Sequence, residues 1–154
     1  MDAIDRRILA ILQADASLSN VELARRVHLS PSPCLARVKA LEKAGVIRGH
    51  VALLDPKALG LNLNVFISIS LKQQTRDALE AFEQAIRTRE EVMECYLMTG
   101  NEDYLIRVAV ADMEALERFI IERLSPMPQV ENIRSSLALK QIRYKTALPL
   151  PEGG

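Results

Sequence analysis

Apolar residues in the first third of the chain recur at the spacing of amphipathic helices. They predict three helices whose inward faces are Ile4, Ile8, Ile11 and Leu12 within 1–16; Val21, Leu23, Ala24 and Val27; and Leu35, Val38 and Leu41. The second helix should begin at Ser19, because a serine three residues before Glu22 is typical of a capping box. The pattern predicts a small three-helix core.

The third helix has two possible starts, because Ser30-Pro31 and Ser32-Pro33 each offer a capping hydroxyl followed by a proline. Gly45 should end this helix in a left-handed conformation. Beyond it, residues 46–48 and 51–54 flank Gly49 and predict a β-hairpin. A helical pair followed by a hairpin indicates a winged helix-turn-helix, which lies in the DNA major groove, and an ordinary helical hairpin is the alternative.

The apolar pattern changes after residue 62, where Val65, Ile67, Ile69 and Leu71 alternate with other residues as in a strand with one buried face. Three more strands are expected over 92–98, 104–111 and 130–143, with helices over 76–87 and between Asp112 and Pro126. The order β-α-β-β-α-β predicts an α+β chain whose second half is a ferredoxin-like sandwich.

These patterns predict four segments. They are a DNA-binding domain over 1–54, a linker over 55–62 with a helical turn at 57–59, a ferredoxin-like domain over 63–148, and a loose tail over 149–154.

The net charge of zero conceals an asymmetry between the two halves of the chain. Residues 1–54 carry eight Lys or Arg against five Asp or Glu, whereas the remainder carries an excess of acids. A basic N-terminal part agrees with DNA binding at that end, although scattered surface charge would explain the same modest excess.

Candidate DNA contacts follow from the third helix, if Leu35, Val38 and Leu41 face inward. Arg37 is then expected on the groove side, where it would read a guanine edge or hold a phosphate. Small Ala36 and Ala40 would permit close approach, and basic side chains would meet the DNA backbone. The expected DNA-binding residues are Ser30, Ser32, Pro33, Arg37, Lys39, Lys43 and Arg48.

Three segments carry a specific resemblance: Leu-Ser-Pro-Ser-Pro-Cys at 29–34, Arg-Val-Lys-Ala-Leu-Glu-Lys-Ala-Gly-Val-Ile at 37–47, and Thr-Gly-Asn-Glu-Asp-Tyr-Leu-Ile-Arg-Val at 99–108. With these motifs the chain resembles, over residues 2–148, the Lrp/AsnC family of transcription regulators. Segments 91–100 and 134–151 look closer still to regulators that activate branched-chain keto-acid dehydrogenase operons. The resemblance implies dimers formed through the sheets, their assembly into tetramers or octamers, and a small amino acid bound between dimers.

The family's effector site matches the loop from Thr99 to Tyr104. Gly100 can take a positive φ and expose backbone N–H groups to a carboxylate, and Asp103 can accept a hydrogen bond from an ammonium group. A hairpin loop selected only for its turn chemistry is the alternative. The expected effector-binding residues are Thr99, Gly100, Asn101, Asp103, Tyr104, Ser135 and Ser136. The expected effector is leucine, valine, isoleucine or methionine.

No other chemistry is prominent. Cys34 and Cys95 are too few for a zinc site or a disulfide framework, which agrees with a reducing cytoplasm, and a packed thiol at Cys34 is favoured over a redox switch. His28 and His50 lie in separate segments, so neither a metal nor another cofactor is expected. No signal peptide or membrane-spanning run is expected. The sequence favours a regulator over an enzyme or metabolite carrier built on the second half, and over a DNA compactor without an effector.

Overall fold

The computed structural model describes residues 1–150, and these form two compact units. The first unit contains residues 1–53 together with 142–150, and the second contains residues 54–141. The segment after residue 141 therefore belongs with the N-terminal unit, whereas the sequence pattern grouped residues up to 148 with the second domain. Four residues of the expected loose tail, 151–154, lie outside the described residues.

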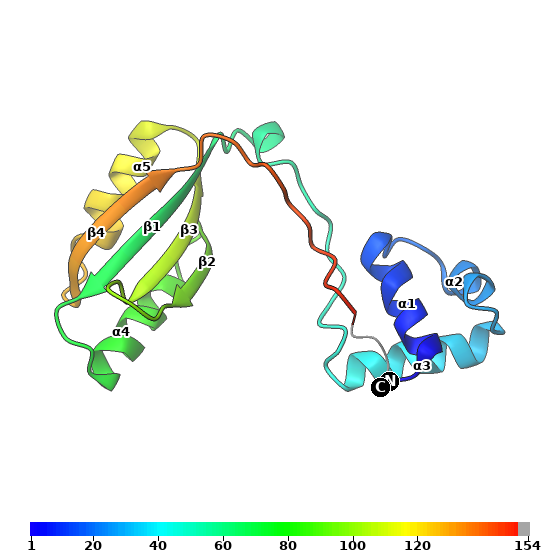
Figure 1. Cartoon of the computed structure of the whole chain (residues 1–154). Helices are drawn as coiled ribbons and strands as arrows, with labels where there is room; N and C mark the ends of the chain where they lie inside the picture. Colours follow the sequence, from blue (N-terminus) through cyan, green and yellow to red (C-terminus); the bar gives the residue numbers. More distant parts are fainter. Residues whose placement is uncertain (151–154) are drawn as a thin grey trace. The chain divides into compact units, whose positions relative to one another are not determined.

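The first unit consists of three helices, α1 (Ala3–Ala14), α2 (Asn20–Arg26) and α3 (Pro31–Lys43) (Figure 1). Ser19 caps α2 by accepting the Glu22 N–H at 3.2 Å. The first Ser-Pro pair starts α3, with Ser30 as the N-cap and Pro31 as the first helical residue.

The core of this unit collects one face of each helix. Its buried apolar side chains are Ile8, Leu9, Leu23, Ala24, Val27, Cys34 and Leu41. The expected inward positions of Val21 and Leu35 are wrong: these side chains are 66% and 41% exposed, because the buried sides of their helices are centred on Leu23 with Ala24 and on Cys34 with Leu41. Leu150 packs against the same core, and both polar ends of the Gln13 side chain bond to the backbone of Leu148. These contacts attach the C-terminal segment to the helical unit.

The predicted β-hairpin over residues 46–54 is wrong for this structure, because no strand lies in that range. Gly45 does adopt the expected positive φ of 72°, and the next two N–H groups both donate to the Leu41 carbonyl as a helix cap. Ile47 alone of this segment packs on the core, and Val51 is 80% exposed. An isolated two-stranded hairpin with no buried face has little to stabilise it.

The second unit begins with a 3₁₀ turn, η1 (Lys57–Leu59), at the predicted position. Four strands and two helices follow: β1 (Leu63–Leu71), α4 (Arg76–Arg87), β2 (Val92–Leu97), β3 (Tyr104–Val110), α5 (Met113–Phe119) and β4 (Val130–Leu137). A π-helical turn, η2 (Ile120–Leu124), extends α5. The predicted element order is confirmed, except that β4 ends at residue 137 rather than 143.

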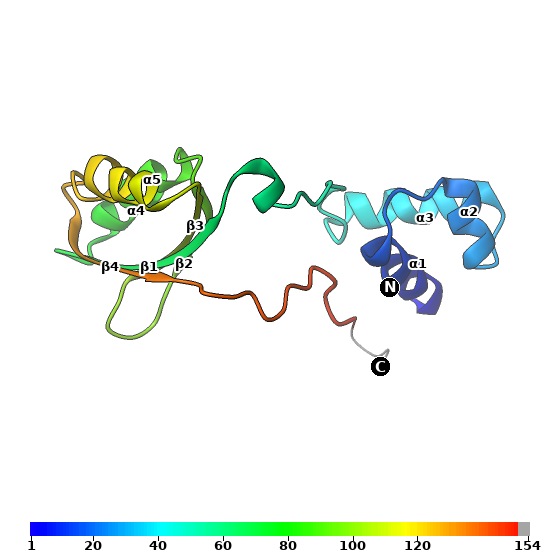
Figure 2. The same ribbon diagram turned by 90° about the horizontal axis from the view of Figure 1, so that it is seen from above.

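The sheet is antiparallel with the strand order β2-β3-β1-β4, and α4 and α5 cover one of its faces (Figure 2). Alternate residues of β1 and β3, such as Ile67 and Ile106, are fully buried beneath these helices. The opposite face has no helical cover within the unit, and Phe66 on it remains 38% exposed. No helix of residues 1–150 is long and apolar enough to cross a membrane.

Candidate DNA-binding and effector sites

The α3 helix has a buried face and an exposed face that lie opposite each other. Cys34, Val38 and Leu41 pack into the core at spacings of four and three residues. Four exposed residues with the same kind of spacing lie on the other side of the helix: Ser32, Ala36, Lys39 and Lys43. At 100° per residue, the mean directions of the two sets differ by about 160–170°. We call the second set the outer face of α3.

Arg37 does not lie on this outer face. Its guanidinium donates through Nη1 to Asp2 Oδ2 and to Asp5 Oδ1, each at 2.7 Å. The placement of Arg37 on the groove side therefore differs from the structure, because its side chain is directed toward the N-terminus of α1. A guanidinium shared between two carboxylates has less capacity to read a base edge.

The two carboxylates also form the capping box of α1. Asp2 Oδ1 accepts the Asp5 N–H at 2.9 Å, and Asp5 Oδ2 accepts the Asp2 N–H at 3.0 Å. Each carboxylate thus uses one oxygen to cap its own helix and the other to bind α3. Hydrogen bonding to the Asp5 backbone, and then to Arg37, holds the pKa of Asp2 below its ordinary value. We call Asp2, Asp5 and Arg37 the α1–α3 clamp.

The remaining predicted DNA contacts are accessible. Lys39, Lys43 and Arg48 are exposed, and no ion pair within residues 1–150 involves them. Ser30 and Pro33 are exposed at the start of α3, and the Ser30 side chain makes no capping hydrogen bond there. Basic and hydroxyl groups on and around one face of a helix suit contact with phosphates and base edges.

Cys34 lies on the buried side of α3, with no exposed surface. Burial raises the pKa of its thiol. Reactive cysteines are exposed and have lowered pKa values, so the packed-thiol interpretation fits this residue.

The loop between β2 and β3 contains the second group of predicted residues. Gly100 has a φ of 117°, a conformation that favours glycine, and no other group lies within 4 Å of where its Cβ would be. Among the described residues, no hydrogen bond is made by the backbone N–H groups of residues 99–102. Consecutive unpaired N–H groups beside a glycine can bind an anion such as a carboxylate.

Asp103 connects this loop to β1. Its Oδ2 accepts the Leu71 N–H at 2.7 Å, and its own N–H donates to the Ile69 carbonyl at 3.0 Å. One carboxylate oxygen is therefore engaged in holding the hairpin, and the other makes no hydrogen bond within the described residues. Glu102 beside it binds the Ser70 hydroxyl and pairs with Arg134.

Tyr104 faces the helices rather than the loop. It is 1% exposed, its ring lies 4.6 Å from that of Phe82 between centroids, and its hydroxyl donates to Glu83 Oε1 at 2.8 Å. Burial and the neighbouring Glu83 raise the pKa of Tyr104. Its side chain is thus a core element, and its backbone closes the loop.

Ser135 and Ser136 point to opposite faces of the sheet, since they are adjacent in β4. Ser135 pairs with Ile67 and lines an apolar groove along α5, whereas Ser136 pairs with Phe66 on the open face. Tyr104 pairs with Ile69, two residues along β1 from Ile67. A single chain therefore does not bring both serines into one pocket with the loop.

Sequence reasoning missed the carboxylates that bind Arg37. The Asp-x-x-Asp spacing at positions 2 and 5 was a local signal for a cap, but nothing local indicated that α3 would supply the counter-charge. It also missed Asn20, whose side-chain amide donates to the Pro31 carbonyl at 2.8 Å and joins the starts of α2 and α3. No metal-binding cluster of His, Cys, Asp or Glu occurs in the described part of the chain.

Two family models cover most of the chain. Residues 1–48 match a winged helix-turn-helix DNA-binding domain, and residues 64–148 match the Lrp/AsnC ligand-binding domain. The leucine-responsive regulatory protein of Klebsiella pneumoniae is 42% identical over 148 residues, which span 96% of this chain and 90% of the relative. The corresponding protein of Escherichia coli K12 gives the same values.

Solved structures agree with these matches. A transcriptional regulator of Neisseria meningitidis in complex with L-Met has a TM-score of 0.92 and 42% identity, with 97% of this chain and 96% of that chain covered. An AsnC family regulator of Agrobacterium tumefaciens has a TM-score of 0.91 and 40% identity, with 97% of each chain covered. With a DNA-binding helix-turn-helix and an amino-acid ligand-binding domain on one chain, this protein belongs to the Lrp/AsnC family of transcription regulators, which are not enzymes.

Proposed function

We propose that the chain regulates genes of amino-acid metabolism by reading an operator with the outer face of α3. A small apolar amino acid bound at the Thr99–Tyr104 loop controls this binding. The observation that carries the proposal is the outer face itself. Ser32, Ala36, Lys39 and Lys43 are accessible on the side of α3 opposite the core, and nothing in their own unit covers them. Small and basic residues on one helix face allow close approach to a groove and contact with phosphates.

The loop supports the effector part of the proposal. The unpaired N–H groups around Gly100 suit a carboxylate, and the free oxygen of Asp103 suits an ammonium group. In this proposal, Ser135 and Ser136 contribute to the effector site only in an oligomer, where a second copy of the chain completes the site. Leucine, valine, isoleucine and methionine remain the proposed effectors, because relatives are named as leucine-responsive and a similar structure contains L-Met.

A dimer formed through the open sheet face is part of the same proposal, with further association into tetramers or octamers. Phe66 and Tyr96 are 38% and 52% exposed on or beside this face, which gives it apolar area to bury. An effector that binds one assembly more tightly shifts the population toward it and thereby changes operator affinity. The proposed target is a branched-chain keto-acid dehydrogenase operon, controlled in the cytoplasm, and the resemblance of segments 91–100 and 134–151 to regulators of such operons is the reason for this choice.

The test begins with duplexes selected from a randomised DNA pool by the full-length protein. We expect one preferred sequence, and we expect Lys39→Ala and Lys43→Ala each to reduce the slope of log K against log salt by about 0.9. Asp77→Ala on the exposed surface of α4 provides a control substitution of a charged residue. A pool that yields no preferred sequence would contradict sequence-specific reading, and unchanged salt slopes would remove the two lysines from the interface.

A further inference from the structure

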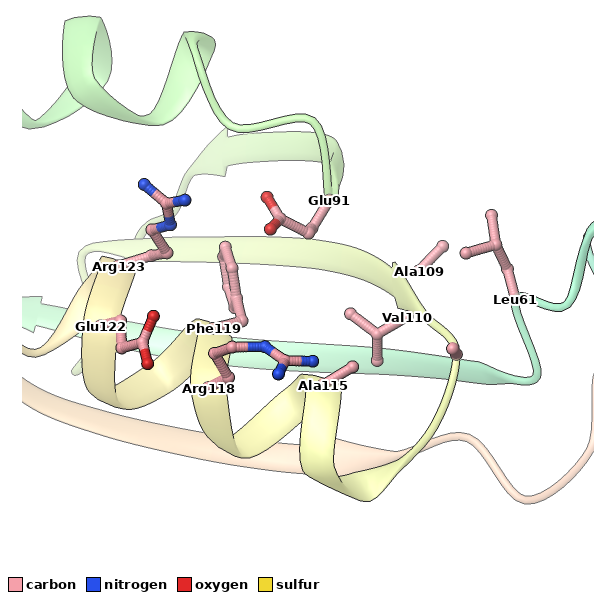
Figure 3. Close-up of a pocket in the computed structure, with 10 residues that line it drawn as sticks. Leu61, Glu91, Ala109, Val110, Ala115, Arg118, Phe119, Glu122 and Arg123 are labelled. Atoms are coloured by element: carbon pink, nitrogen blue, oxygen red, sulfur yellow. The ribbon is translucent and has the colours of Figure 1, made fainter.

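A second candidate ligand site lies on the helical side of the second unit, at the end of β3. A hollow of about 230 Å³ opens there between α5 with its π-helical turn, the last residues of β3, and the segment that leads into β2 (Figure 3). Phe119 and Val110, which are 2% and 3% exposed, form its apolar base. We call this the α5–β3 hollow.

Charged groups of both signs border the hollow. Arg118 and Arg123 come from the helix, and Glu91 comes from the segment before β2. Figure 3 shows Glu91 and Arg118 on opposite sides of the Phe119 and Val110 side chains. Glu122 adds a second carboxylate at the helical wall.

Most of these charged side chains have no ion-pair partner within residues 1–150. Within residues 1–150, no side-chain hydrogen bond or ion pair involves Glu91, Glu122 or Arg123. Arg118 has one weak partner, Glu114, at 3.9 Å on the exposed helix surface. The clamp around Arg37 and the pairs of Arg107 and Arg134 show the opposite arrangement, in which each guanidinium is bound by a carboxylate.

The backbone around the hollow is specialised. Helix α5 widens into the π-helical turn η2, and the Ser125 N–H donates to the Ile120 carbonyl at 2.8 Å, five residues earlier. In a regular α-helix, residues five apart differ by about 140° around the axis, so a wider turn helps Arg118 and Arg123 to border one hollow. Single π-helical turns are rare and occur often at functional sites. The Glu91 carbonyl accepts the Ala109 N–H at 3.0 Å, which fixes the facing wall to β3.

From these features we propose that the α5–β3 hollow binds a small zwitterion. Its carboxylate contacts Arg123 and its ammonium group contacts Glu91, since neither of these side chains has an ion-pair partner within residues 1–150, and its carbon chain lies on Phe119 and Val110. Balanced charges favour a ligand with no net charge over an anion such as phosphate, which Glu91 and Glu122 would repel. The site is separate from the Thr99–Tyr104 loop and does not depend on the proposed role of that loop.

The test is titration calorimetry of the full chain with two zwitterions of different charge separation, L-methionine and 5-aminopentanoate. Acetate and methylammonium serve as ligands that carry only one of the two charges. We expect at least one zwitterion to bind the hollow, with affinity at least about tenfold lower in Glu91→Gln/Arg123→Gln, because two charge-assisted contacts are lost. The matched control is Arg76→Gln/Glu80→Gln, which removes an exposed ion pair of α4.

Two further variants separate this site from the loop. Ala115→Leu fills the hollow without changing a charge and is expected to remove the same binding, with thermal unfolding used to confirm that each variant folds. Gly100→Ala perturbs the loop alone and should leave binding in the hollow intact. The proposal would be overturned if Gly100→Ala abolished zwitterion binding while the folded hollow variants bound as wild type does. It would also be overturned if neither zwitterion bound to the wild-type protein. Binding lost only in the hollow variants would support the hollow and contradict the loop site.

Discussion

The α3 helix and the Thr99–Tyr104 loop are the two regions that carry the proposed regulation, and they are constructed differently. In α3, burial of Cys34 and Leu41 leaves a defined set of outward residues, so helical geometry determines what DNA can contact. In the loop, backbone groups around Gly100 are available, while Asp103 and Tyr104 also hold the domain together. A substitution on α3 can therefore separate binding from stability, whereas most substitutions in the loop change both.

The largest effect is expected from a negative charge on the outer face of α3. Ala36→Glu should weaken binding to the selected duplex about 100-fold or more, because a carboxylate facing phosphates is repelled at a cost of several kcal/mol. Ala10→Glu, at an exposed position of α1, is the matched control and should bind nearly as wild type. Fluorescence anisotropy measures both, and equal losses in the two variants would mean that α3 has no special outer face.

Removal of the Asp103 carboxylate tests whether this side chain stabilises the domain. Asp103→Ala leaves the Leu71 N–H without its acceptor, so the free energy of unfolding should fall by about 1–3 kcal/mol. Asp103→Asn keeps an acceptor oxygen and should lose less. Urea unfolding followed by circular dichroism measures the difference. If Asp103→Ala were as stable as wild type, Asp103 would be free for a ligand alone.

The clamp on Arg37 distinguishes a residue that positions α3 from one that reads DNA. We expect Arg37→Ala to lower the free energy of unfolding modestly, because the ion pairs that it removes are partly exposed. The variant should reduce operator affinity only a few-fold and leave the base preference unchanged. Arg37→Lys should recover part of the stability. In a double-mutant cycle, Asp5→Ala and Arg37→Ala together should destabilise less than the sum of the two single effects. Part of the Asp5→Ala effect should remain in the Arg37→Ala background, because Asp5 also accepts the Asp2 N–H in the cap of α1. A preference relaxed at one base pair by about 1–3 kcal/mol would instead identify Arg37 as a direct reader.

The smallest effect is a pH dependence of the first unit. Hydrogen bonds from Arg25 and Arg26 lower the pKa of Glu22 from 4.5 to about 2, and the pKa of Asp2 lies below its ordinary 3.8. Because both values are depressed on folding, the stability that they contribute is complete above about pH 5 and declines as the pH falls below 4.5. Thermal unfolding between pH 7 and pH 3 should show a shallower decline in Glu22→Gln/Arg37→Ala. An unchanged slope would mean that these exposed contacts contribute nothing.

The sequence predicted much of both regions because their signals are local. The alternation around Ile67 and the spacing of Val38 and Leu41 determine which side of an element is buried. The capping residues and Gly45 determine where the helices start and end. The alternation of Tyr104 with Ile106 is also a local signal that the Tyr104 side chain faces the core, where the structure places it.

The differences between the expected and the observed structure arise largely from partners that are distant in the sequence. Helical geometry alone placed Arg37 toward the groove, and the two carboxylates that bind its guanidinium lie more than thirty residues upstream. The hairpin after Gly45 was predicted from the apolar runs on either side of Gly49, but their side chains Val51, Leu53 and Leu54 are exposed, so the two runs have no buried face to stabilise strands. The C-terminal segment is attached to the helical unit through Gln13 and Leu150. These contacts join residues far apart in the sequence, so no local sequence pattern predicts them.

The link between the loop and α3 is tested most directly by the change in operator affinity that an amino acid produces. Gly100→Ala and Gly60→Ala form a matched pair, since both glycines have positive φ and an open space around the missing Cβ, but only Gly100 lies in the loop. The selected duplex is titrated into each protein with and without L-leucine or L-methionine. We predict that wild type and Gly60→Ala respond alike, and that Gly100→Ala keeps its affinity without effector but loses the response. An undiminished response in Gly100→Ala would contradict the account.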